Sequence, residues 1–334
     1  MTDEIALSVE NLKTFFYTNK RCNKAVNGVS FNIKKGKTLC VVGESGCGKS
    51  VTASTIMQLL PTLSRIEEGS VTYHSDRGDI RIDELPRDGS EMRRIRGSEI
   101  SMIFQDPMTA LNPVYTIGFQ IAESLQYHTD LNSSEIKARV IELLTDMGIP
   151  LPEQRAEEYP HNFSGGMRQR AMIAMAMSCN PKILIADEPT TALDVTIQAQ
   201  IFGLMDKLKS EHHTAIMLIT HDMGVVAELA DEVAVMYMGN IVEAGKVDDV
   251  LRRPRHPYTR ALLDSIPVLG RGRNQDIKSI RGATPDPYDR PVGCQFAPRC
   301  DFASDACKQM PSEDFVNDTH RVSCWAHKEI AQNG

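Results

Sequence analysis

The octapeptide GESGCGKS, residues 43–50, decides how the whole chain is interpreted. It fits the pattern G-x-x-x-x-G-K-[ST] and lies between the apolar stretch TLCVV (38–42) and a helix-compatible segment (50–60) that stops at Pro61. A strand, a glycine-rich turn and a helix in this order make a loop whose N–H groups, here from Glu44 to Ser50, surround a phosphate. The sequence therefore predicts nucleotide contacts from Gly43, Glu44, Ser45, Gly46, Cys47, Gly48, Lys49, Ser50 and Val51.

Lys49 and Ser50 carry the charged and the metal-binding groups of this loop. The Lys49 ammonium is expected to neutralise the β- and γ-phosphates, and the Ser50 hydroxyl to ligate Mg²⁺. Further along, the apolar segment ILIA (183–186) ends in two carboxylates. Asp187 suits Mg²⁺, directly or through a water, and Glu188 suits the water that attacks the γ-phosphate, as general base.

Two more polar residues follow predicted strands. Gln105 follows the segment 100–104 and carries an amide able to reach Mg²⁺ or water, although it is also an ordinary loop residue. His221 follows 215–219 and could contact the γ-phosphate, or could serve only in packing or capping. Because doubly wound sheets bind ligands at the carboxyl ends of their strands, we expect both side chains to lie near the phosphate loop.

The order of strands and helices indicates an α/β fold. Short apolar runs alternate with helical stretches such as 195–209, which predicts a largely parallel sheet with helices on both faces. Residues 1–35 and 66–82 show short alternating patterns and are expected to form an antiparallel sheet beside it. From about 113 to 180 no strand pattern is visible, and we expect a helical insert. The strands predicted for the main sheet are 38–42, 100–104, 183–186, 215–219 and 232–237.

Six motifs occur in the order typical of ATP-binding cassette ATPases, and residues 1 to about 250 resemble that family. They are the Walker A sequence GESGCGKS, the Q-loop FQDP (104–107), the signature FSGGM (163–167), the Walker B sequence ILIADE (183–188), the D-loop TALD (191–194) and the switch histidine in ITHD (219–222). The resemblance implies a P-loop NTPase cassette with a RecA-like core, an antiparallel β-subdomain and an α-helical subdomain. It also implies hydrolysis of MgATP, with catalytic roles for Lys49, Gln105, Glu188 and His221.

The signature is a second Ser-Gly-Gly turn that runs into a helix, and so a second potential anion site. In the family that this chain resembles, two cassettes stack head to tail, and the signature of one closes over ATP held by the other. The resemblance therefore implies that Ser164, Gly165, Gly166 and Asp194 contact ATP across a pair of chains. It also implies an aromatic residue against adenine within LKTFFYT (12–18), where Phe16 matches best, Tyr17 is the alternative, and burial of the ring in the small sheet is the other option.

Several stretches are similar to ATPases of dipeptide and oligopeptide importers. These are YPHNFSGGMRQR (159–170), with Met167 where the commonest signature has Gln, HPYTRALL (256–263) and PVGCQFAPRC (291–300). The similarity implies the ATPase subunit of a bacterial peptide importer at the cytoplasmic face of the cell membrane. Its expected partners are a second, homologous ATPase subunit in a heterodimer, two transmembrane permease subunits and an extracytoplasmic substrate-binding protein.

Other functions fit the same cassette and stay open. Nickel complexes or another small solute could replace peptides as cargo, and a soluble cassette ATPase acting on DNA or ribosomes is a further alternative. The net charge of −7 argues against nucleic acid as a partner. The start of the chain lacks a secretory pattern, and no apolar run approaches the roughly 20 residues of a spanning helix, so we expect a peripheral protein.

Residues 251–334 shift toward Pro, Arg and Cys and are expected to form an extended C-terminal appendage. Four thiolates here suit tetrahedral Zn²⁺ or an iron–sulfur cluster, and His320 could replace one of them. The resemblance to peptide-importer ATPases implies a 4Fe–4S cluster; zinc and free thiols are the alternatives, and a redox module is a rival function. Cys47, in the phosphate loop, is expected to have a lowered pKa and to react with alkylating agents. The four tail cysteines are Cys294, Cys300, Cys307 and Cys324.

Overall fold

The computed structural model describes residues 4–18, 21–190, 195–265 and 280–332. Its centre is an eight-stranded sheet in the order β11-β12-β10-β9-β3-β8-β7-β6. The strands from β9 to β6 run parallel, and β10, β12 and β11 continue the sheet in antiparallel fashion at one edge. All five predicted strands form, with ends within one residue of the prediction. The strands are β3 (Thr38–Val42), β6 (Ile100–Ile103), β7 (Ile183–Asp187), β8 (Ala215–Thr220), β9 (Glu232–Tyr237), β10 (Asn240–Lys246), β11 (Asp314–Phe315) and β12 (Arg321–Val322).

Strand β3 shows why these apolar segments become central strands. All five of its residues are buried, and the four from Leu39 to Val42 alternate between two hydrophobic cores. Cys40 and Val42 pack into the core shared with the helical insert, whereas Leu39 and Val41 face the core shared with α1 (Lys49–Ile56). Successive side chains of a strand point to opposite faces, so a strand covered on both faces is apolar throughout.

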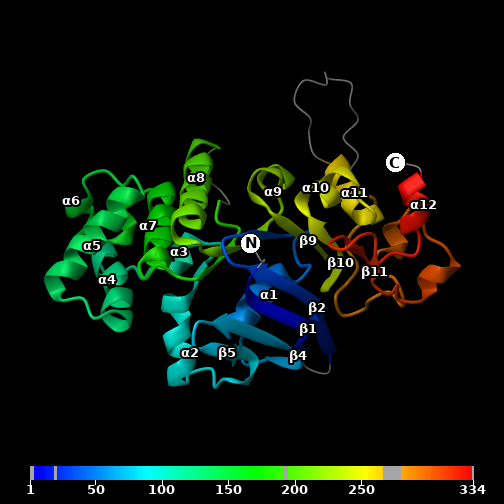
Figure 1. Cartoon of the computed structure of the whole chain (residues 1–334), viewed down its shortest axis with the longest axis horizontal. Helices are drawn as coiled ribbons and strands as arrows, with labels where there is room; N and C mark the ends of the chain where they lie inside the picture. Colours follow the sequence, from blue (N-terminus) through cyan, green and yellow to red (C-terminus); the bar gives the residue numbers. More distant parts are fainter. Residues whose placement is uncertain (1–3, 19–20, 191–194, 266–279, 333–334) are drawn as a thin grey trace.

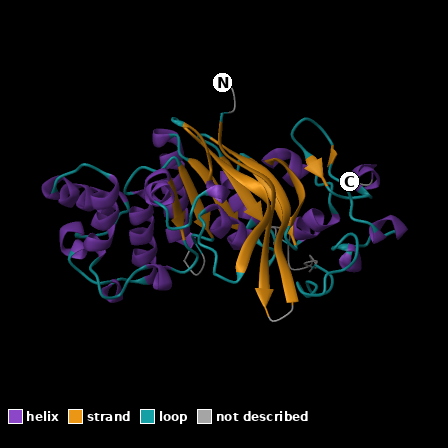
Figure 2. Ribbon diagram, turned by 90° about the horizontal axis from the view of Figure 1, so that it is seen from below, coloured by secondary structure: helices purple, strands orange, loops and turns teal. Residues whose placement is uncertain are grey.

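A second, four-stranded antiparallel sheet covers α1 and one face of the central sheet. It has the order β2-β1-β4-β5 and corresponds to the antiparallel sheet expected from the sequence. Val9 lies opposite Phe31 and Val71, and all three are buried. Figure 2 shows the long strands in the middle of the molecule, with the helical insert on one side and the C-terminal residues on the other. The strands are β1 (Ile5–Thr18), β2 (Arg21–Lys34), β4 (Ser64–Ser75) and β5 (Gly78–Arg81).

The helical insert forms one end of the molecule (Figure 1). Its longest helix, α5, begins with a capping box in which Asn132 and Glu135 each accept a hydrogen bond from the other's backbone N–H. The buried residues Ile136, Val140 and Leu143 then recur on one helix face and pack into the core. The described residues between 113 and 180 include no strand. The helices are α4 (Ile117–His128), α5 (Ser133–Asp146), α6 (Pro152–Ala156) and α7 (Gly165–Met177).

The remaining helices cover the sheets and link their strands. Helix α1 ends earlier than the expected 50–60, because Gln58 adopts a left-handed backbone conformation with φ of 49°. None of the helices in the described part of the chain combines the length and the apolar character that a membrane crossing requires. These helices are α2 (Ser90–Arg94), α3 (Pro107–Ala110), α8 (Val195–His212), α9 (Met223–Leu229), α10 (Val247–Arg252), α11 (Pro257–Asp264) and α12 (His327–Gln332), with short 3₁₀ or π turns at 82–84, 95–99, 160–162, 297–299 and 305–308.

Two short strands of the C-terminal residues, β11 and β12, extend the central sheet, so this part of the chain packs against the cassette. Val322 of β12 pairs with Glu243 of β10. Glu243 is 1% exposed, and its carboxylate accepts hydrogen bonds from the backbone N–H groups of Arg255 and His256 at 2.6 and 3.0 Å. Nε2 of His320 lies 2.8 Å from the same carboxylate. A buried carboxylate with three partners therefore fixes the C-terminal residues to the sheet.

Candidate nucleotide site

The loop of residues 43–50 joins β3 to α1 and lies tightly against the strands behind it. A Cβ atom on Gly43 would lie 2.1 Å from the carbonyl oxygen of Met236, and one on Gly48 would lie 2.3 Å from that of Ala25. Both distances are far below van der Waals contact, so only glycine fits at these two positions. The close fit holds the loop at the carboxyl end of β3, where open α/β sheets bind ligands.

A cavity of about 400 Å³ opens beside this loop. Its walls include Phe16 of β1, Ser50 of α1, Gln105 after β6 and Glu188 after β7. Tyr17 does not line the cavity, because its hydroxyl donates instead to a carboxylate on the neighbouring strand β4 at 2.7 Å. Of the two aromatic residues considered for adenine, Phe16 is therefore the one that faces the cavity.

Oxygen atoms suited to a hard cation lie next to the loop. Ser50 Oγ donates to Asp187 Oδ1 at 3.1 Å, and Asp187 is 4% exposed. Burial raises the pKa of Asp187, whereas the hydrogen bond from Ser50 and the charge of Lys49 lower it. A nearby cation would likewise favour the ionised carboxylate. Together with the Gln105 amide at the same cavity, these groups are the oxygen ligands that Mg²⁺ prefers, so the residues predicted for Mg²⁺ fit the ion.

Glu188 is held between the two polar residues that follow the neighbouring strands. Gln105 Nε2 donates to Glu188 Oε2 at 3.0 Å, and His221 Nδ1 lies 3.4 Å from Glu188 Oε1. The backbone of Glu188 has φ of 45°, and its N–H donates to the Ile219 carbonyl at 2.9 Å. Three side chains from the ends of β6, β7 and β8 thus meet at one point, as their positions after predicted strands suggested.

The loop backbone differs from the expectation at Glu44. The N–H of Glu44 donates to the Tyr258 hydroxyl at 2.7 Å, so it does not point at a phosphate. The Lys49 ammonium donates to the carbonyl oxygens of Gly43 and Glu44 at 2.7 and 3.1 Å. Gly43, Glu44 and Cys47 do not line the cavity, and their contacts with a nucleotide stay a prediction. The loop residues that do line it are Ser45, Gly46, Gly48, Lys49, Ser50 and Val51.

Cys47 points into the protein and away from the cavity. It is 2% exposed, and burial raises the pKa of its thiol, while the charge of Lys49 lowers it in part. A thiol at a helix N-terminus has a lowered pKa only where solvation of the thiolate survives, and here burial outweighs that effect. The expected lowering of the Cys47 pKa is therefore wrong, and the burial of the thiol predicts slow alkylation.

The signature residues lie on the insert and not at the cavity of their own chain. Ser164 caps α7, and its hydroxyl accepts a hydrogen bond from the Met167 N–H at 3.3 Å. Ser164 and Gly165 are exposed, and neither they nor Gly166 line the cavity. The N-terminal end of α7 is thus open to another molecule. Asp194 lies outside the described residues.

The four tail cysteines share one neighbourhood in the C-terminal residues. The Cys294 N–H donates to the Cys307 carbonyl at 2.9 Å. Burial, with a smaller contribution from the other tail cysteines, raises the pKa of Cys300 to about 11 and that of Cys324 to about 12. Within the described ranges, however, no three His, Cys, Asp or Glu side chains are arranged to hold a metal ion. The described side chains therefore do not show a bound 4Fe–4S cluster or zinc ion, and His320 pairs with a carboxylate.

Three residues near the site were missed by the sequence analysis. Tyr258 binds the Glu44 N–H, Arg299 forms an ion pair with the Glu44 carboxylate, and Tyr288 lines the cavity. Arg299 and Glu44 are 255 residues apart in the chain. No spacing or periodicity links residues so distant, and only the fold brings them together.

Comparisons with known proteins agree with this geometry. Residues 26–191 match the family model "ABC transporter", and residues 242–307 match "Oligopeptide/dipeptide transporter, C-terminal region". The chain is 48% identical to the probable peptide ABC transporter ATP-binding protein y4tR of Sinorhizobium fredii, over 98% of this chain and 96% of that one. It is 50% identical to the oligopeptide transport ATP-binding protein AppD of Bacillus subtilis, over 97% of each chain.

The fold is also found among solved structures. The dimeric structure of MJ0796, a bacterial ABC transporter cassette, superposes with a TM-score of 0.64 at 28% identity, over 72% of this chain and 98% of that one. These matches cover the parts of this chain that hold the phosphate loop, the carboxylates at the end of β7 and the C-terminal region. The chain belongs to the ATP-binding proteins of ABC transporters, in the group that carries the oligopeptide/dipeptide transporter C-terminal region.

Proposed function

We propose that the chain hydrolyses ATP to drive a bacterial importer of dipeptides or oligopeptides. The observation that carries this proposal is the position of Glu188, which is held by Gln105 and His221 at a cavity walled by the phosphate loop. The cargo is inferred from relatives named for oligopeptide and dipeptide transport. In this proposal residues 1–250 form the cassette, with the helical subdomain at about 113–180, and residues 251–334 form the extension.

In the proposed site each residue has a distinct task. Phe16 stacks on adenine, the N–H groups of the loop bind the phosphates, and Lys49 neutralises their charge. Ser50, Asp187 and Gln105 would hold Mg²⁺, which would further neutralise the charge of the phosphates. Glu188 accepts the proton of the attacking water, and its contacts to Gln105 and His221 orient the carboxylate for that transfer.

Each ATP is proposed to lie between two cassettes. The second cassette contributes its signature, Ser164, Gly165 and Gly166, and the D-loop residue Asp194. Support comes from the exposed N-terminal end of α7, which lies away from the chain's own cavity, and from the dimeric structure of the related cassette MJ0796. The full complex would pair this chain with a homologous ATPase subunit on two permease subunits at the cytoplasmic face of the membrane, supplied by an extracytoplasmic substrate-binding protein.

Purification of the membrane complex tests the function and the cargo together. The tagged chain is isolated from membranes with its co-purifying subunits and reconstituted in proteoliposomes with MgATP. Uptake of labelled dipeptides and oligopeptides is measured for the wild type and for Glu188→Gln. We expect peptide uptake with the wild type only. Uptake of nickel or another small solute without peptide uptake, or recovery of the chain with nucleic acid and no permease, would refute the proposal.

We also propose that the four tail cysteines form a cofactor site for an iron–sulfur cluster, or for zinc. The support is their common neighbourhood and the N–H groups aimed at sulfur, such as that of Phe302, 3.3 Å from Cys300 Sγ. No three His, Cys, Asp or Glu side chains of the described residues are arranged around one metal ion, so the proposed mechanism takes no step through this site. Iron, sulfide and zinc analysis of anaerobically purified wild type and Cys300→Ser tests it. Wild-type protein free of all three would exclude the site.

A further inference from the structure

The extension reaches the phosphate loop through Arg299. This side chain is 3% exposed, and its Nη1 and Nη2 donate to the two carboxylate oxygens of Glu44 at 2.6 and 3.0 Å. The pair is bidentate, the geometry in which a guanidinium binds a carboxylate most strongly. Glu44 is the second residue of the phosphate loop, so a strong contact connects the extension to the loop itself.

Arg299 is fixed on its other sides as well. Its Nε donates to the Arg281 carbonyl at 2.9 Å, and Nη2 also lies 3.3 Å from the Gly282 carbonyl. The guanidinium lies over the rings of Tyr237 and Phe296, 5.8 Å from each centroid. These contacts hold the arginine in one position, and through it the Glu44 carboxylate.

A second contact from the extension holds the backbone of the same residue. The Tyr258 hydroxyl accepts the Glu44 N–H at 2.7 Å, and Tyr258 is completely buried, with its ring 4.7 Å from that of Tyr237. The Glu44 carbonyl in turn accepts from the Lys49 ammonium at 3.1 Å. Glu44 is therefore held by the extension at its side chain and its N–H, and it contacts the phosphate-binding lysine through its carbonyl.

We propose that Arg299 is a positioning residue of the nucleotide site: acting through Glu44, it holds the phosphate loop in the shape that binds ATP. The inference rests on the proposed function, since ATP is the ligand concerned. Its opposite is a purely structural role, in which Arg299 only attaches the extension to the cassette. The two differ in what they predict for nucleotide affinity.

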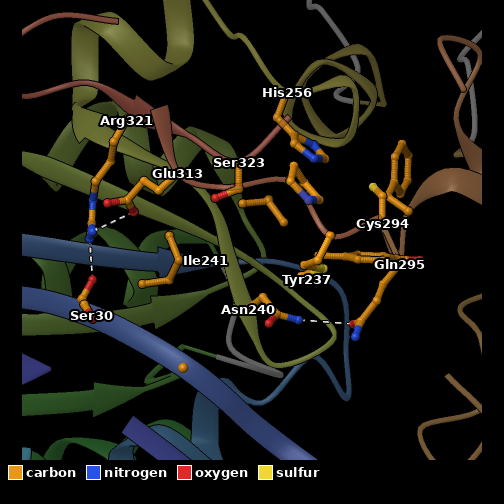
Figure 3. A pocket seen from close by; sticks show the side chains of 15 residues that line it. Ser30, Tyr237, Asn240, Ile241, His256, Cys294, Gln295, Glu313, Arg321 and Ser323 are labelled. Carbon is orange, nitrogen blue, oxygen red and sulfur yellow. Dashed lines mark hydrogen bonds and ion pairs between the residues drawn. The ribbon is translucent and has the colours of Figure 1, made fainter. Parts of the chain in front are cut away.

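Arg321 offers a matched control. It is also an arginine of the extension that reaches the cassette, because Nη2 donates to the Ser30 carbonyl on β2 and Nη1 donates to Glu313 at 2.9 Å. Figure 3 shows both contacts beside a cavity of about 300 Å³ between β10 and the extension. Arg321 does not contact the phosphate loop, so its loss tests attachment alone.

The test is a double-mutant cycle on the full chain. The affinity for MgATP is measured by displacement of a fluorescent nucleotide, and KM and kcat are measured in the reconstituted complex. Arg299→Gln should weaken MgATP binding and raise KM about tenfold, equivalent to about 1.4 kcal/mol, with kcat within about twofold because Glu188 is untouched. Glu44→Gln should do the same, and the double variant should be no weaker than the weaker single one. Arg299→Lys keeps the positive charge but loses the bidentate geometry, so its affinity for MgATP should lie between those of the wild type and Arg299→Gln.

The outcomes separate the readings. Arg321→Gln should lower Tm without changing the affinity for MgATP. Equal losses for Arg321→Gln and Arg299→Gln, additive losses in the double variant, or unchanged affinity in both Arg299→Gln and Glu44→Gln would overturn the inference. If Arg299→Gln does not fold, Glu44→Gln decides, because it removes the same ion pair without altering the extension. If the wild type binds MgATP no more tightly than Lys49→Ala does, the proposed function itself fails.

Discussion

Replacing Glu243 by Ala should destabilise the protein strongly, because this carboxylate is completely buried and holds the C-terminal residues to β10. The change leaves two backbone N–H groups and the His320 ring without their acceptor. A buried donor without a partner costs roughly 1–3 kcal/mol, and this substitution leaves three such donors. We therefore expect the free energy of unfolding to fall by about 4 kcal/mol.

For a chain of this length each kcal/mol corresponds to about 2 °C in Tm, so Tm should fall by about 8 °C. Differential scanning calorimetry of wild type and Glu243→Ala measures it. Asp248→Ala is the control, because Asp248 and its partner Arg252 are 74% and 80% exposed and a surface pair contributes little. If Glu243→Ala unfolds within 2 °C of the wild type, the buried carboxylate does not hold the C-terminal residues in place, and this reasoning is refuted.

Four further outcomes follow from the site. Glu188→Gln should trap an ATP-bound pair of cassettes without turnover, seen as a dimer by size-exclusion chromatography with MgATP. If the variant elutes only as a monomer, both by itself and when mixed with its natural partner, the prediction is contradicted. Phe16→Ala should raise KM for ATP about tenfold, whereas Tyr17→Ala should leave it within twofold, and equal effects would remove the adenine assignment. Cys47 should resist alkylation at pH 8 in the folded chain, and rapid labelling detected by mass spectrometry would contradict its burial. Burial lowers the pKa of His256 to about 4, so between pH 6.5 and 4 this histidine is protonated in the unfolded state but not in the folded state. The free energy of unfolding should therefore fall as the pH falls through this window, and Tm with it. His256→Asn should reduce this pH dependence of Tm, and an unchanged dependence would contradict the prediction.

The central strands could be predicted because burial on both faces leaves a simple signature. Strand β3 is a run of five apolar or β-branched residues between Lys37 and Gly43, and so short a run buried on both faces is typical of a central strand. The two-residue strands β11 and β12 carry no such pattern, since a pair of residues has no periodicity. The end of α1 was misjudged for a similar reason: the left-handed turn at Gln58 depends on its surroundings and not on propensity.

In the site, residues at strand ends were predictable and residues brought in by the fold were not. Gln105, Glu188 and His221 follow recognisable strands, so topology alone places them together. The choice between Phe16 and Tyr17 could not be made by alternation, because the pairing of β1 with β2 shifts register between Thr14 and Phe16. The pairing of Arg299 with Glu44 likewise depends on tertiary packing, and the local sequence around either residue does not predict it.

The pairing of β12 with β10 has a practical meaning for work with shortened forms of this protein. Fragments that stop near residue 250 would uncover the hydrogen-bonding edge of β10 at Glu243 and Ala244. A bare strand edge invites strands from other molecules, which is a common origin of aggregates. A cassette expressed without the C-terminal residues would therefore aggregate, and the resulting loss of activity should not be mistaken for a defect in catalysis.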